Sequence, residues 1–500
     1  MYILVYHPLS QPGYSSLNYV TKTKPYEHQK TALQDLWDRE YLGVFWEMGT
    51  GKSKLVIDQL GKLYEEKRID TVLIFAPKGV YDNWVREEIP LHLPDRIKYR
   101  LVRWQPNLSE KFKNEMRDVV YRKNREPDML HILIMNVESM STSKGANTAF
   151  LYLKENPDNI MIVDESTTIK NRTALRTKNV IKASRLAKYR RILTGSPVTK
   201  SPLDLFSQCE CLSPEALNFK SYYAFRNRYA TVQQRNMGTK SFQEVVGYRR
   251  LDELNTKLDT FSTRILKEDC LDLPSKTYVR RDVPLTTEQK EMYRQMKRLA
   301  LAQFESGELA TTSSVLTQIM RLQQICCGWL RPDEGEPEDI PNNRLNELMA
   351  VTDEVQGKVI IWCSWTRDIH RIATALRHRF GNEAVALYFG ETPQKDRQEI
   401  IKRFQDPDSG LRFFVGQPKT GGFGITLTAA HTMIYFSNSY DLEIRIQSED
   451  RVHRIGQEKP VTYVDLVSPN TIDEKILQAL REKIDISSEV LGEKARSWLI

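Results

Sequence analysis

Short runs of almost continuous apolar residues occur in two groups along the chain, each run separated from the next by helical patterns. The first group lies at 42–46, 71–76, 131–135, 159–163 and 190–193. The second lies at 359–362, 384–387, 412–415, 433–436 and 461–464. Strands that are apolar throughout are buried on both faces, and such strands alternate with helices in parallel sheets. The pattern therefore predicts an α/β fold with two parallel-sheet lobes.

The segments around these two groups have a different character. Residues 1–24 precede the first lobe and are expected to form an N-terminal arm. Residues about 203–262 are rich in aromatic and basic residues and lack strand-like runs, which predicts a helical insert. Residues about 284–343 combine helical periodicity with an acidic, proline-rich connector, which predicts a helical protrusion. We expect a first lobe at 25–270, which includes the insert, and a second lobe at 271–500, which includes the protrusion.

The composition is typical of a soluble globular protein. Of the 500 residues, 40% are hydrophobic and 28% are charged, which argues against wholesale disorder. We find no apolar run long enough for a membrane helix and no signal-peptide pattern. The six cysteines lack zinc-binding spacing and fit free thiols in a reducing compartment. We expect a cytoplasmic protein with no membrane partner, while a nuclear location stays open. The net charge of +8 permits a polyanionic partner.

A glycine-rich segment follows the first apolar run and opens a helical stretch. Its residues are Met48, Gly49, Thr50, Gly51, Lys52 and Ser53. Glycines in such a turn let backbone amides converge on phosphate at a helix N-terminus. Lys52 would reach the β- and γ-phosphates of ATP, and the Ser53 hydroxyl would bind Mg²⁺. The first glycine of the P-loop pattern is missing, because Trp46 stands at its position.

An acidic pair, Asp164 and Glu165, follows the apolar run at 159–163. Asp164 would hold Mg²⁺, and Glu165 would orient and polarise the attacking water. A pair at a strand end is more often a cap or a surface pair, but this one lies in the same predicted lobe as Lys52. Gln29 precedes the P-loop, and its amide is able to pair with both a donor and an acceptor on the adenine edge.

The second lobe contributes two arginines, Arg451 and Arg454, three residues apart. On a helix they would share one face. Two guanidinium groups aimed the same way can stabilise charge on a transferring phosphoryl group, although this spacing also occurs on salt-bridged surface helices. Earlier in the same lobe, Lys419 and Thr420 open a glycine-rich segment, which permits close approach of the backbone to phosphate or to the other lobe.

Together these segments resemble the SWI/SNF-like branch of superfamily-two helicase-type ATPases, from residue 29 to about residue 480. Residues 47–53 (EMGTGKS) resemble the family's P-loop, and residues 163–171 (VDESTTIKN) resemble its Walker B segment. Residues 193–197 (LTGSP) resemble LTGTP, which in the family couples nucleotide state to DNA contact. Residues 451–457 (RVHRIGQ) resemble RAHRIGQ, which is highly specific to this branch. The resemblance implies two RecA-like lobes, ATP and Mg²⁺ as cofactors, and DNA as the partner.

Several positions depart from the family pattern. Ser166 and Thr167 follow the acidic pair where the family has alanine and histidine, which puts coupling through that histidine in doubt. Thr426 replaces a customary asparagine, Lys200 stands where an asparagine is frequent, and Tyr440 replaces a customary tryptophan. None of these departures removes a group that hydrolysis needs.

Two sets of residues are candidates for DNA contact. The resemblance implies a first set, which lines the DNA track or couples it to the nucleotide site: Lys78, Asn136, Thr194, Gly195, Lys419, Thr420, Gly422 and Gln447. The basic and aromatic composition of the insert suggests a second set: Arg226, Arg228, Arg235 and Lys240. Both would contact the sugar-phosphate backbone with little sequence specificity. The alternative is an insert that packs its own tyrosines and carries its cations as surface charge.

The resemblance favours an ATP-dependent translocase that moves on duplex DNA and remodels forks, branched junctions or DNA-bound proteins. Two alternatives stay open: a strand-separating helicase on DNA or RNA, and an ATP-gated clamp with little hydrolysis. We find no accessory domain that would supply the wedge for strand separation, although a short hairpin can escape detection in a sequence. We expect a monomer whose candidate partners include replication or recombination proteins.

Overall fold

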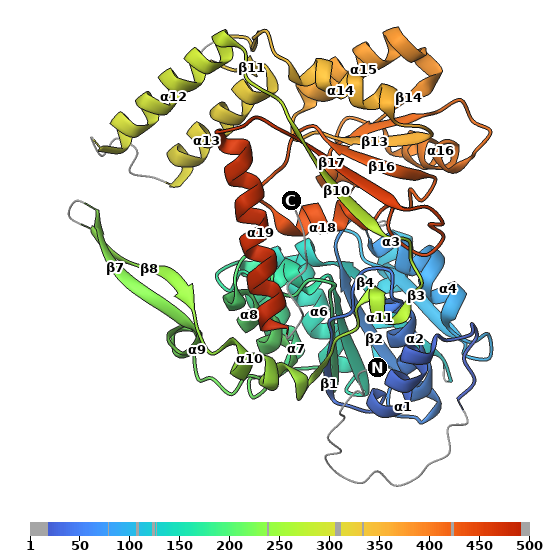
Figure 1. Ribbon diagram of the computed structural model, residues 1–500. Coiled ribbons are helices and arrows are strands. Elements are labelled where there is room, and N and C mark those ends of the chain that lie inside the picture. The colour runs from blue at the N-terminus through green and yellow to red at the C-terminus, as the bar shows by residue number, and fades with distance from the viewer. Residues whose placement is uncertain are drawn as a thin grey trace.

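The chain folds into two α/β lobes, one above the other in Figure 1. The structure is a computed structural model that describes residues 19–78, 80–106, 110–122, 126, 128–237, 240–305, 312–332, 335–421 and 425–491. Of the predicted N-terminal arm, only residues 19–24 are among these. They lie against the first lobe, where Lys22 forms an ion pair with Asp95 at 2.5 Å.

The first lobe is built on a seven-stranded sheet in the order β3-β4-β2-β5-β6-β1-β9. Its strands are β1 (Tyr41–Val44), β2 (Thr71–Ala76), β3 (Tyr99–Arg103), β4 (Leu130–Asn136), β5 (Asn159–Asp164), β6 (Tyr189–Leu193) and β9 (Ser262–Thr263). Every neighbouring pair is parallel. The carboxyl ends of these strands therefore lie along a single edge, which is where ligands bind in open α/β sheets.

Successive side chains of the central strands enter two different cores, as a doubly covered sheet requires. On β2, Val72 and Ile74 join one buried cluster, whereas Leu73 and Phe75 join the other. The first cluster is covered by α1 (Glu27–Leu36), α2 (Lys52–Glu65) and α4 (Ile89–His92). The second is covered by α5 (Glu110–Val120), α6 (Ser143–Glu155), α7 (Leu175–Ser184) and α8 (Leu205–Leu212).

The second lobe has a six-stranded parallel sheet in the order β10-β17-β16-β13-β15-β14. Its strands are β10 (Lys276–Asp282), β13 (Lys358–Trp362), β14 (Val385–Tyr388), β15 (Phe413–Gly416), β16 (Ala430–Tyr435) and β17 (Val461–Val467). Its helices include α14 (Arg344–Glu354), α15 (Thr366–Phe380), α16 (Gln394–Gln405) and α18 (Leu442–Glu449). Two parallel sheets with helices on both faces confirm the predicted fold class.

The insert in the first lobe differs from the prediction. Helices α9 (Tyr222–Tyr229) and α10 (Leu251–Asp259) flank an antiparallel hairpin made of β7 (Ala230–Met237) and β8 (Lys240–Tyr248). The prediction of a purely helical insert is therefore wrong at 230–248. These strands carry polar residues on both faces, so they lack the apolar run by which the buried strands were recognised.

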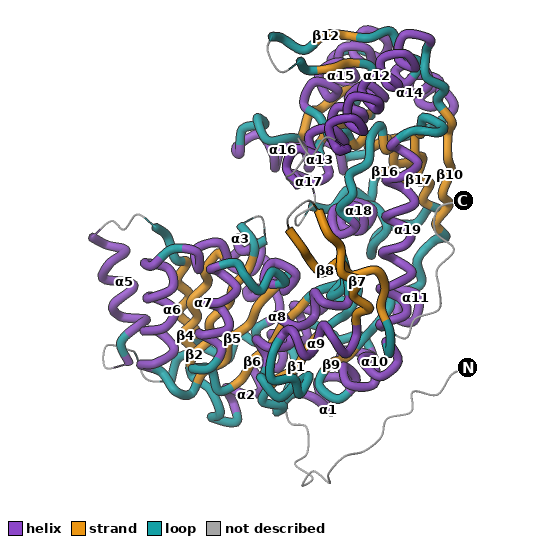
Figure 2. The backbone as a smooth tube through the Cα atoms, turned by 90° about the vertical axis from the view of Figure 1, so that its left-hand side faces the viewer, coloured by secondary structure: helices purple, strands orange, loops and turns teal. Residues whose placement is uncertain are grey.

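The predicted protrusion of the second lobe contains two long helices, α12 (Thr287–Glu305) and α13 (Thr312–Cys327). These helices and the β7–β8 hairpin project from the same side of the molecule, the left side of Figure 1, which faces the viewer in Figure 2. The acidic connector that follows contains a short antiparallel pair, β11 (Trp329–Leu330) and β12 (Glu338–Asp339).

A long C-terminal helix, α19 (Ile472–Val490), joins the two lobes (Figure 1). Leu480 and Ile484 belong to a buried cluster of the second lobe, whereas Val490 lies in a core of the first. The remaining short helices are α3 (Tyr81–Asn83), α11 (Lys267–Cys270) and α17 (Pro418–Gly421), with a π-helix at Trp84–Glu88 and 3-10 turns at Val137–Ser141, Ser166–Ile169, Pro202–Asp204 and Asn382–Ala384. In the part of the chain that the structure describes, no helix has the length and apolar character to cross a bilayer.

Candidate active site between the lobes

The glycine-rich segment forms the turn between β1 and α2. Gly49 and Gly51 have φ angles of 81° and 85°, in the left-handed region that favours glycine. Gly51 is the N-cap of α2, which begins at Lys52, and no side chain caps the first turn. The free amides of a first helical turn attract anions, and the helix dipole adds to that attraction. The local geometry thus suits phosphate.

Lys52 points back over this turn. Its ammonium group donates hydrogen bonds to the carbonyls of Trp46 at 3.0 Å and Glu47 at 3.2 Å. Burial lowers the pKa of Lys52, and the nearby carboxylates of Glu165 and Asp164 oppose that shift. The predicted phosphate-binding lysine and the predicted acidic pair therefore lie at the same edge of the sheet, close enough to interact electrostatically.

Gln29 supports the turn from α1. Its amide nitrogen donates to the carbonyls of Thr50 at 3.4 Å and Gly51 at 3.3 Å, and its oxygen accepts the backbone N–H of Tyr26 at 2.9 Å. A Cβ added to Gly51 would lie 1.9 Å from this amide, so only glycine fits there. Gln29 thus holds the loop in shape, and its contact with adenine stays a prediction.

Asp164 and Glu165 stand at the carboxyl end of β5. One carboxylate oxygen of Asp164 accepts a hydrogen bond from the indole N–H of Trp84 at 2.8 Å, and the other accepts the backbone N–H of Glu165 at 3.0 Å. Glu165 has a φ of 48°, which turns the chain sharply after the strand. Burial raises the pKa of both carboxyl groups, that of Glu165 to about 8, where the charge of Asp164 adds to the effect.

Two buried carboxyl groups with raised pKa values form a site that a divalent cation would stabilise, because the cation compensates the charge that burial disfavours. Mg²⁺ prefers carboxylate and hydroxyl oxygens, and it keeps several of its waters. Asp164 at the strand end and Ser53 in the first turn of α2 are the oxygen donors that the motif offers. The donor set therefore fits the predicted ion.

Two residues next to Asp164 were missed by the sequence analysis. Trp84 orients Asp164, and Glu88 lies close enough to Asp164, Arg454 and Lys52 for their charges to influence its pKa. Burial raises the pKa of Glu88 to about 7. Both belong to the π-helix at Trp84–Glu88, which follows β2. No motif marks them in the sequence, because only the return of the chain to the sheet edge brings them to β5.

The two arginines follow α18 rather than belonging to it. The helix ends at Glu449, and Arg451 and Arg454 lie in the turns after it, so the prediction that they share a helical face is wrong. Arg451 is held by the carbonyls of Gln447 at 2.9 Å and Ile425 at 3.3 Å. Burial lowers its pKa to about 10, and Glu165 of the first lobe is one of the carboxylates that oppose the shift.

Arg454 approaches the P-loop itself. A Cβ added to Gly49 would lie 3.7 Å from the Cβ of Arg454, which places this arginine across the cleft from the turn. Burial lowers the pKa of Arg454, and the carboxylates of Asp450, Glu88 and Glu87 counteract the shift. The lobes therefore bring Lys52, Asp164, Glu165, Arg451 and Arg454 together at the boundary between them, which we call the cleft.

A second contact across the cleft runs through Lys267, on the connection between the lobes. Its ammonium group pairs with Asp450 at 2.5 Å and donates to the carbonyl of His453 at 2.7 Å. Its backbone N–H donates to the carboxylate of Glu47, beside the P-loop, at 2.7 Å. Lys267 thus links the P-loop to the arginine segment, although no sequence motif marked it.

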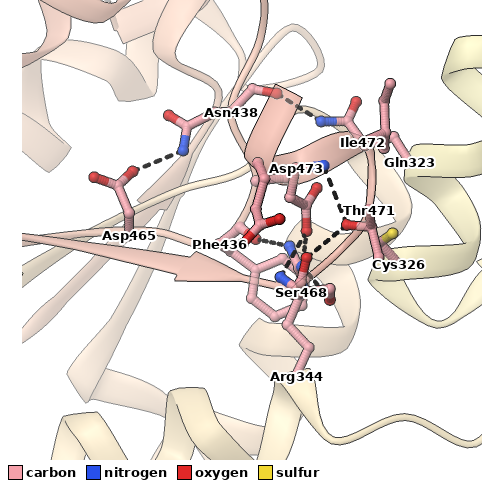
Figure 3. Close-up of polar contacts among 12 residues, drawn as sticks. Gln323, Cys326, Arg344, Phe436, Asn438, Asp465, Ser468, Thr471, Ile472 and Asp473 are labelled. Atoms are coloured by element: carbon pink, nitrogen blue, oxygen red, sulfur yellow. Dashed lines mark hydrogen bonds and ion pairs between the residues drawn. The ribbon is translucent and has the colours of Figure 1, made fainter. Parts of the chain in front are cut away.

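The segment after α18 is anchored by a buried polar network. Arg445 on α18 forms ion pairs with Asp465 at 2.6 Å and Glu449 at 2.8 Å, and all three side chains are almost fully buried. Asp465 also accepts from Asn438 at 2.7 Å, and the carbonyl of Asn438 accepts from Gln323 of α13 at 2.6 Å (Figure 3). The network connects the protrusion helix α13 to the helix that precedes the arginines.

Below it in Figure 3, Arg344 secures the start of α19. Its guanidinium donates to the carbonyl of Phe436 at 2.7 Å, to the hydroxyl of Ser468 at 2.9 Å and to the carboxylate of Asp473. Arg344 has no exposed surface. A fully buried arginine requires such compensation, so this cluster fixes α14, β16 and α19 together.

The predicted coupling residues of the first lobe lie at the ends of its strands. Asn136 ends β4, where its side chain accepts the N–H of Ser139 at 2.7 Å, and exposed Lys78 follows β2. Thr194 and Gly195 follow β6. A Cβ on Gly195 would lie 3.0 Å from the side chain of Met48, so this segment touches the P-loop directly.

In the second lobe, exposed Lys419 and half-buried Thr420 lie on α17, just after β15. Gly422 lies outside the described residues. Gln447 is buried on α18, where its amide donates to Glu443 at 3.4 Å and its carbonyl accepts from Arg451. Gln447 therefore supports the arginine segment in this arrangement, and its contact with DNA stays a prediction.

The arginines of the insert already have partners within the insert. Arg228 forms an ion pair with Glu253, and Arg235 forms one with Glu244 at 2.6 Å. Arg226 donates a hydrogen bond to Gln243. The side chain of Lys240 is outside the description. Each pair is exposed, so its contribution to stability is small and the arginine remains available to a stronger competitor such as phosphate.

The aromatic residues of the insert divide into two groups. Phe225 and Tyr229 are buried and contact each other and Phe219 in edge-to-face geometry. Tyr223 is 55% exposed and lies against the guanidinium groups of Arg172 and Arg226. The alternative interpretation, that the insert packs its own aromatic rings, therefore holds for its buried face.

Comparison with known proteins agrees with this architecture. The model for the SNF2-related domain matches residues 28–329, and the helicase conserved C-terminal domain matches residues 341–456. The chain therefore belongs to the SNF2-related family, a branch of the superfamily-two helicase-type ATPases. The two matches cover residues of both lobes, including all five residues that converge in the cleft.

Among the curated relatives, the probable ATP-dependent DNA helicase CHR12 of Arabidopsis thaliana is 26% identical over 89% of this chain and 39% of its own length. The SWI/SNF-related matrix-associated actin-dependent regulator of chromatin subfamily A member 1 of Homo sapiens is 25% identical over 89% and 41%. The chain thus spans about two fifths of the length of these relatives. A solved structure, the Sulfolobus solfataricus SWI2/SNF2 ATPase core in complex with dsDNA, is 24% identical with a TM-score of 0.41 and covers 94% of each chain.

Proposed function

We propose that this protein is an ATP-driven motor that moves along duplex DNA. The observation that carries the proposal is the convergence of Lys52, Asp164 and Glu165 from one lobe with Arg451 and Arg454 from the other. A phosphoryl-transfer site that is divided between two bodies works only when they close, which links hydrolysis to relative movement of the lobes.

In the proposed reaction, Lys52 and the amides at the start of α2 bind the β- and γ-phosphates of ATP. Glu165 accepts a hydrogen bond from the attacking water and orients it toward the γ-phosphorus. Arg451 and Arg454 stabilise the charge that develops on the transferred group. Mg²⁺, held by Asp164 and Ser53, would neutralise phosphate charge when it is bound.

The DNA track is proposed on three grounds. The relatives named above include one named as a probable ATP-dependent DNA helicase and one named as a SWI/SNF-related regulator of chromatin. Lys78 and Lys419 are exposed residues that each follow a strand, β2 in the first lobe and β15 in the second. The insert and the α12–α13 protrusion project on one common side (Figures 1 and 2). Contacts from such residues would reach the sugar-phosphate backbone of either strand without reading sequence.

The boundary between the two bodies is also proposed. Sheet pairing of the first lobe ends at Thr263, and that of the second begins at Lys276. The connection between them carries Lys267, which contacts both sides of the cleft. These positions support a first lobe at 25–270 and a second at 271–500, with the hinge between them.

The first experiment measures phosphate release with and without duplex DNA and Mg²⁺. We expect hydrolysis that requires Mg²⁺ and that duplex DNA stimulates. Chelation with EDTA should abolish it. Binding of DNA without measurable hydrolysis under any of these conditions would contradict the motor and favour the ATP-gated clamp.

The β7–β8 hairpin gives the strand-separating alternative new weight, because the case against it relied on the lack of a wedge. We still favour translocation that remodels forks or branched junctions. At a junction each base pair broken is replaced by one formed, so the motor needs only to bias a balanced process, whereas opening a duplex costs about 1.4 kcal/mol per stacked step.

The deciding experiment compares three substrates at equal ATP and salt: a duplex that carries a third strand, a simple forked duplex and a mobile four-way junction. We expect third-strand displacement and junction processing, with poor unwinding of the fork. The same assays on a variant in which residues 231–247 are replaced by a short glycine-serine turn would show whether the hairpin contributes. Efficient unwinding of long forks that the hairpin variant loses would establish the helicase alternative.

A further inference from the structure

A single carboxylate of the second lobe contacts the turn that follows the acidic pair of the first. Glu443, near the start of α18, accepts a hydrogen bond from the hydroxyl of Thr167 at 2.5 Å on one oxygen. Its other oxygen forms an ion pair with Lys170 at 2.8 Å. Both partners precede it by more than 270 residues and belong to the other lobe.

The first-lobe partners lie immediately after Glu165. Thr167 is in the 3-10 turn Ser166–Ile169, of which Glu165 is the N-cap and Lys170 the C-cap. Lys170 also donates to the hydroxyl of Thr199 at 2.7 Å, in the segment that follows β6. Glu443 therefore contacts a small assembly that contains the turn after Glu165 and, through Lys170, the residue Thr199 just beyond the LTGSP segment.

On its own side, Glu443 lies on the helix that leads to the arginines. Gln447, one turn later, donates to Glu443 at 3.4 Å, and the carbonyl of Gln447 holds the guanidinium of Arg451 at 2.9 Å. Arg445 fixes the same helix to Asp465 through a buried ion pair. A movement of α18 relative to the first lobe would therefore shift Glu443 and Arg451 together.

The ion pair between Glu443 and Lys170 is only partly buried, which allows it to form and break as the lobes move. Glu443 and Lys170 are 19% and 18% exposed at the side chain, so each can regain water when the lobes part. A pair of this exposure is worth more than a fully solvated one, yet it lacks the desolvation cost of a completely buried pair. Such an interaction favours the closed arrangement without locking it.

We propose that Glu443 is a positioning residue that ties the turn of Glu165 to the arginine-bearing helix when the lobes close. The inference rests on the proposed ATPase function and deepens it. It also gives a role to Thr167, which stands where the resembled family has a histidine: the threonine hydroxyl meets a carboxylate of the opposite lobe. Closure of the lobes and alignment of Glu165 are then one event.

The test uses the full-length protein and four variants: Glu443→Gln, Glu443→Ala, Lys170→Glu, and the charge swap Lys170→Glu with Glu443→Lys. The measurements are kcat with and without duplex DNA, KM for ATP, and thermal stability. The matched control is Glu210→Gln, because Glu210 forms an ion pair with Arg185 at 2.6 Å that lies wholly within the first lobe and is also partly exposed.

We expect Glu443→Ala to lower the DNA-stimulated kcat by roughly 5- to 150-fold, the usual range of coupling between two sites. Glu443→Gln should lower it less, because its amide can still bond Thr167. KM for ATP should change little, since no phosphate contact is lost. The charge swap should recover a substantial part of the loss, and Glu210→Gln should behave as the wild type.

A wild-type rate for Glu443→Ala would overturn the proposal. So would a loss that the charge swap fails to recover while Lys170→Glu alone is harmless, because the ion pair would then have no role. If the wild-type protein hydrolyses no ATP in any condition, the proposed function fails instead, and the two failures are thus distinguishable.

Discussion

Charged residues are buried in the cleft between the lobes, whereas they are exposed in the insert of the first lobe. In the cleft, charged groups from both lobes are buried together, and burial shifts the pKa values of Lys52, Glu165 and Arg451 away from their ordinary values. In the insert, Arg228 and Arg235 are exposed and already have carboxylate partners. The same residue types therefore serve different purposes in the two regions.

This difference indicates where function is concentrated. Burial of charges without full local neutralisation is costly, and proteins tolerate it chiefly at functional sites. Exposed pairs cost little and contribute little, so they say less about function. The cleft should respond to single substitutions by orders of magnitude, and the insert should respond by small factors. Four predictions test that contrast, from the largest expected effect to the smallest.

The largest effect is expected for Arg454→Ala. This arginine lies across from Gly49 of the P-loop, where it would stabilise charge on the transferred phosphoryl group. Loss of an arginine with this role lowers the rate by on the order of 10³ or more. The measurement is DNA-stimulated phosphate release at saturating ATP, with Lys52→Ala as a second variant that should also weaken ATP binding.

The control for Arg454→Ala is Arg379→Ala, which removes an exposed arginine of the same lobe that pairs with Asp353 at 2.6 Å. It should leave the rate unchanged. A near wild-type rate for Arg454→Ala in the presence of DNA would show that the site is not shared between the lobes, and the contrast between cleft and insert would fail.

The second prediction concerns Glu165→Gln. The variant should bind ATP and stop turning over, because an uncharged amide polarises the attacking water far less than a carboxylate does. ATP binding measured by equilibrium titration, beside phosphate release, separates the two steps. Turnover close to that of the wild type would exclude Glu165 as the residue that orients and polarises the water.

In the absence of nucleotide and Mg²⁺, the Glu165→Gln variant should also differ from the wild type in how its thermal stability depends on pH. Burial raises the pKa of Glu165 from 4.5 to about 8, so the folded protein retains a proton that the unfolded chain releases. The contribution of the Glu165 carboxyl group to the free energy of unfolding is therefore largest below pH 4.5, and it falls as the pH rises toward 8. Glu165→Gln lacks the titration, so its melting temperature should decline less over that range than that of the wild type.

Most of the strands were predictable from the sequence, because a buried parallel strand has an apolar run that few other structures share. The run at 71–76 matches β2 residue for residue, and the other apolar runs lie within three residues of observed strands. The strands that were missed have another character. β3 and β10 are sheet edges with partly exposed, charged residues, and the hairpin strands are polar on both faces.

The residues of the candidate site also fall into two groups, those that the sequence marks and those that only the fold reveals. Lys52, Asp164 and Arg454 stand in short motifs whose spacing reflects local backbone geometry, so the sequence marks them. Trp84, Lys267 and Glu443 act through contacts that span 80 to 276 residues along the chain, and only the fold brings those partners together. Long-range contacts of this kind leave no local pattern in a single sequence.

The third prediction concerns the buried network that anchors α18. Asp465→Asn removes one charge from the pair with Arg445, and breaking a buried pair in this way typically costs about 3–5 kcal/mol. Unfolding by denaturant would measure the loss, with Asp353→Asn, an exposed partner of Arg379, as the control that should cost less than about 1 kcal/mol. Equal losses for both variants would mean that the network near the cleft is no more critical than a surface pair.

The smallest effects are expected in the insert, where they decide whether its arginines contact DNA. If Arg228 contacts phosphate, DNA must compete with Glu253 for it, since both bind the same guanidinium. Arg228→Ala should then flatten the dependence of log K on log salt by up to about one unit, one phosphate contact being lost. Glu253→Gln should act in the opposite direction and tighten DNA binding at low salt by a small factor, because the arginine is released from its ion pair.

DNA-free hydrolysis should stay unchanged in both variants, which separates this effect from a folding defect. Arg281→Ala, in an exposed cluster of the second lobe with Glu347 and Glu354, is the matched control. If Glu253→Gln and Arg228→Ala both leave binding unchanged at several salt concentrations, the arginines are surface charge, and the contrast with the cleft becomes complete.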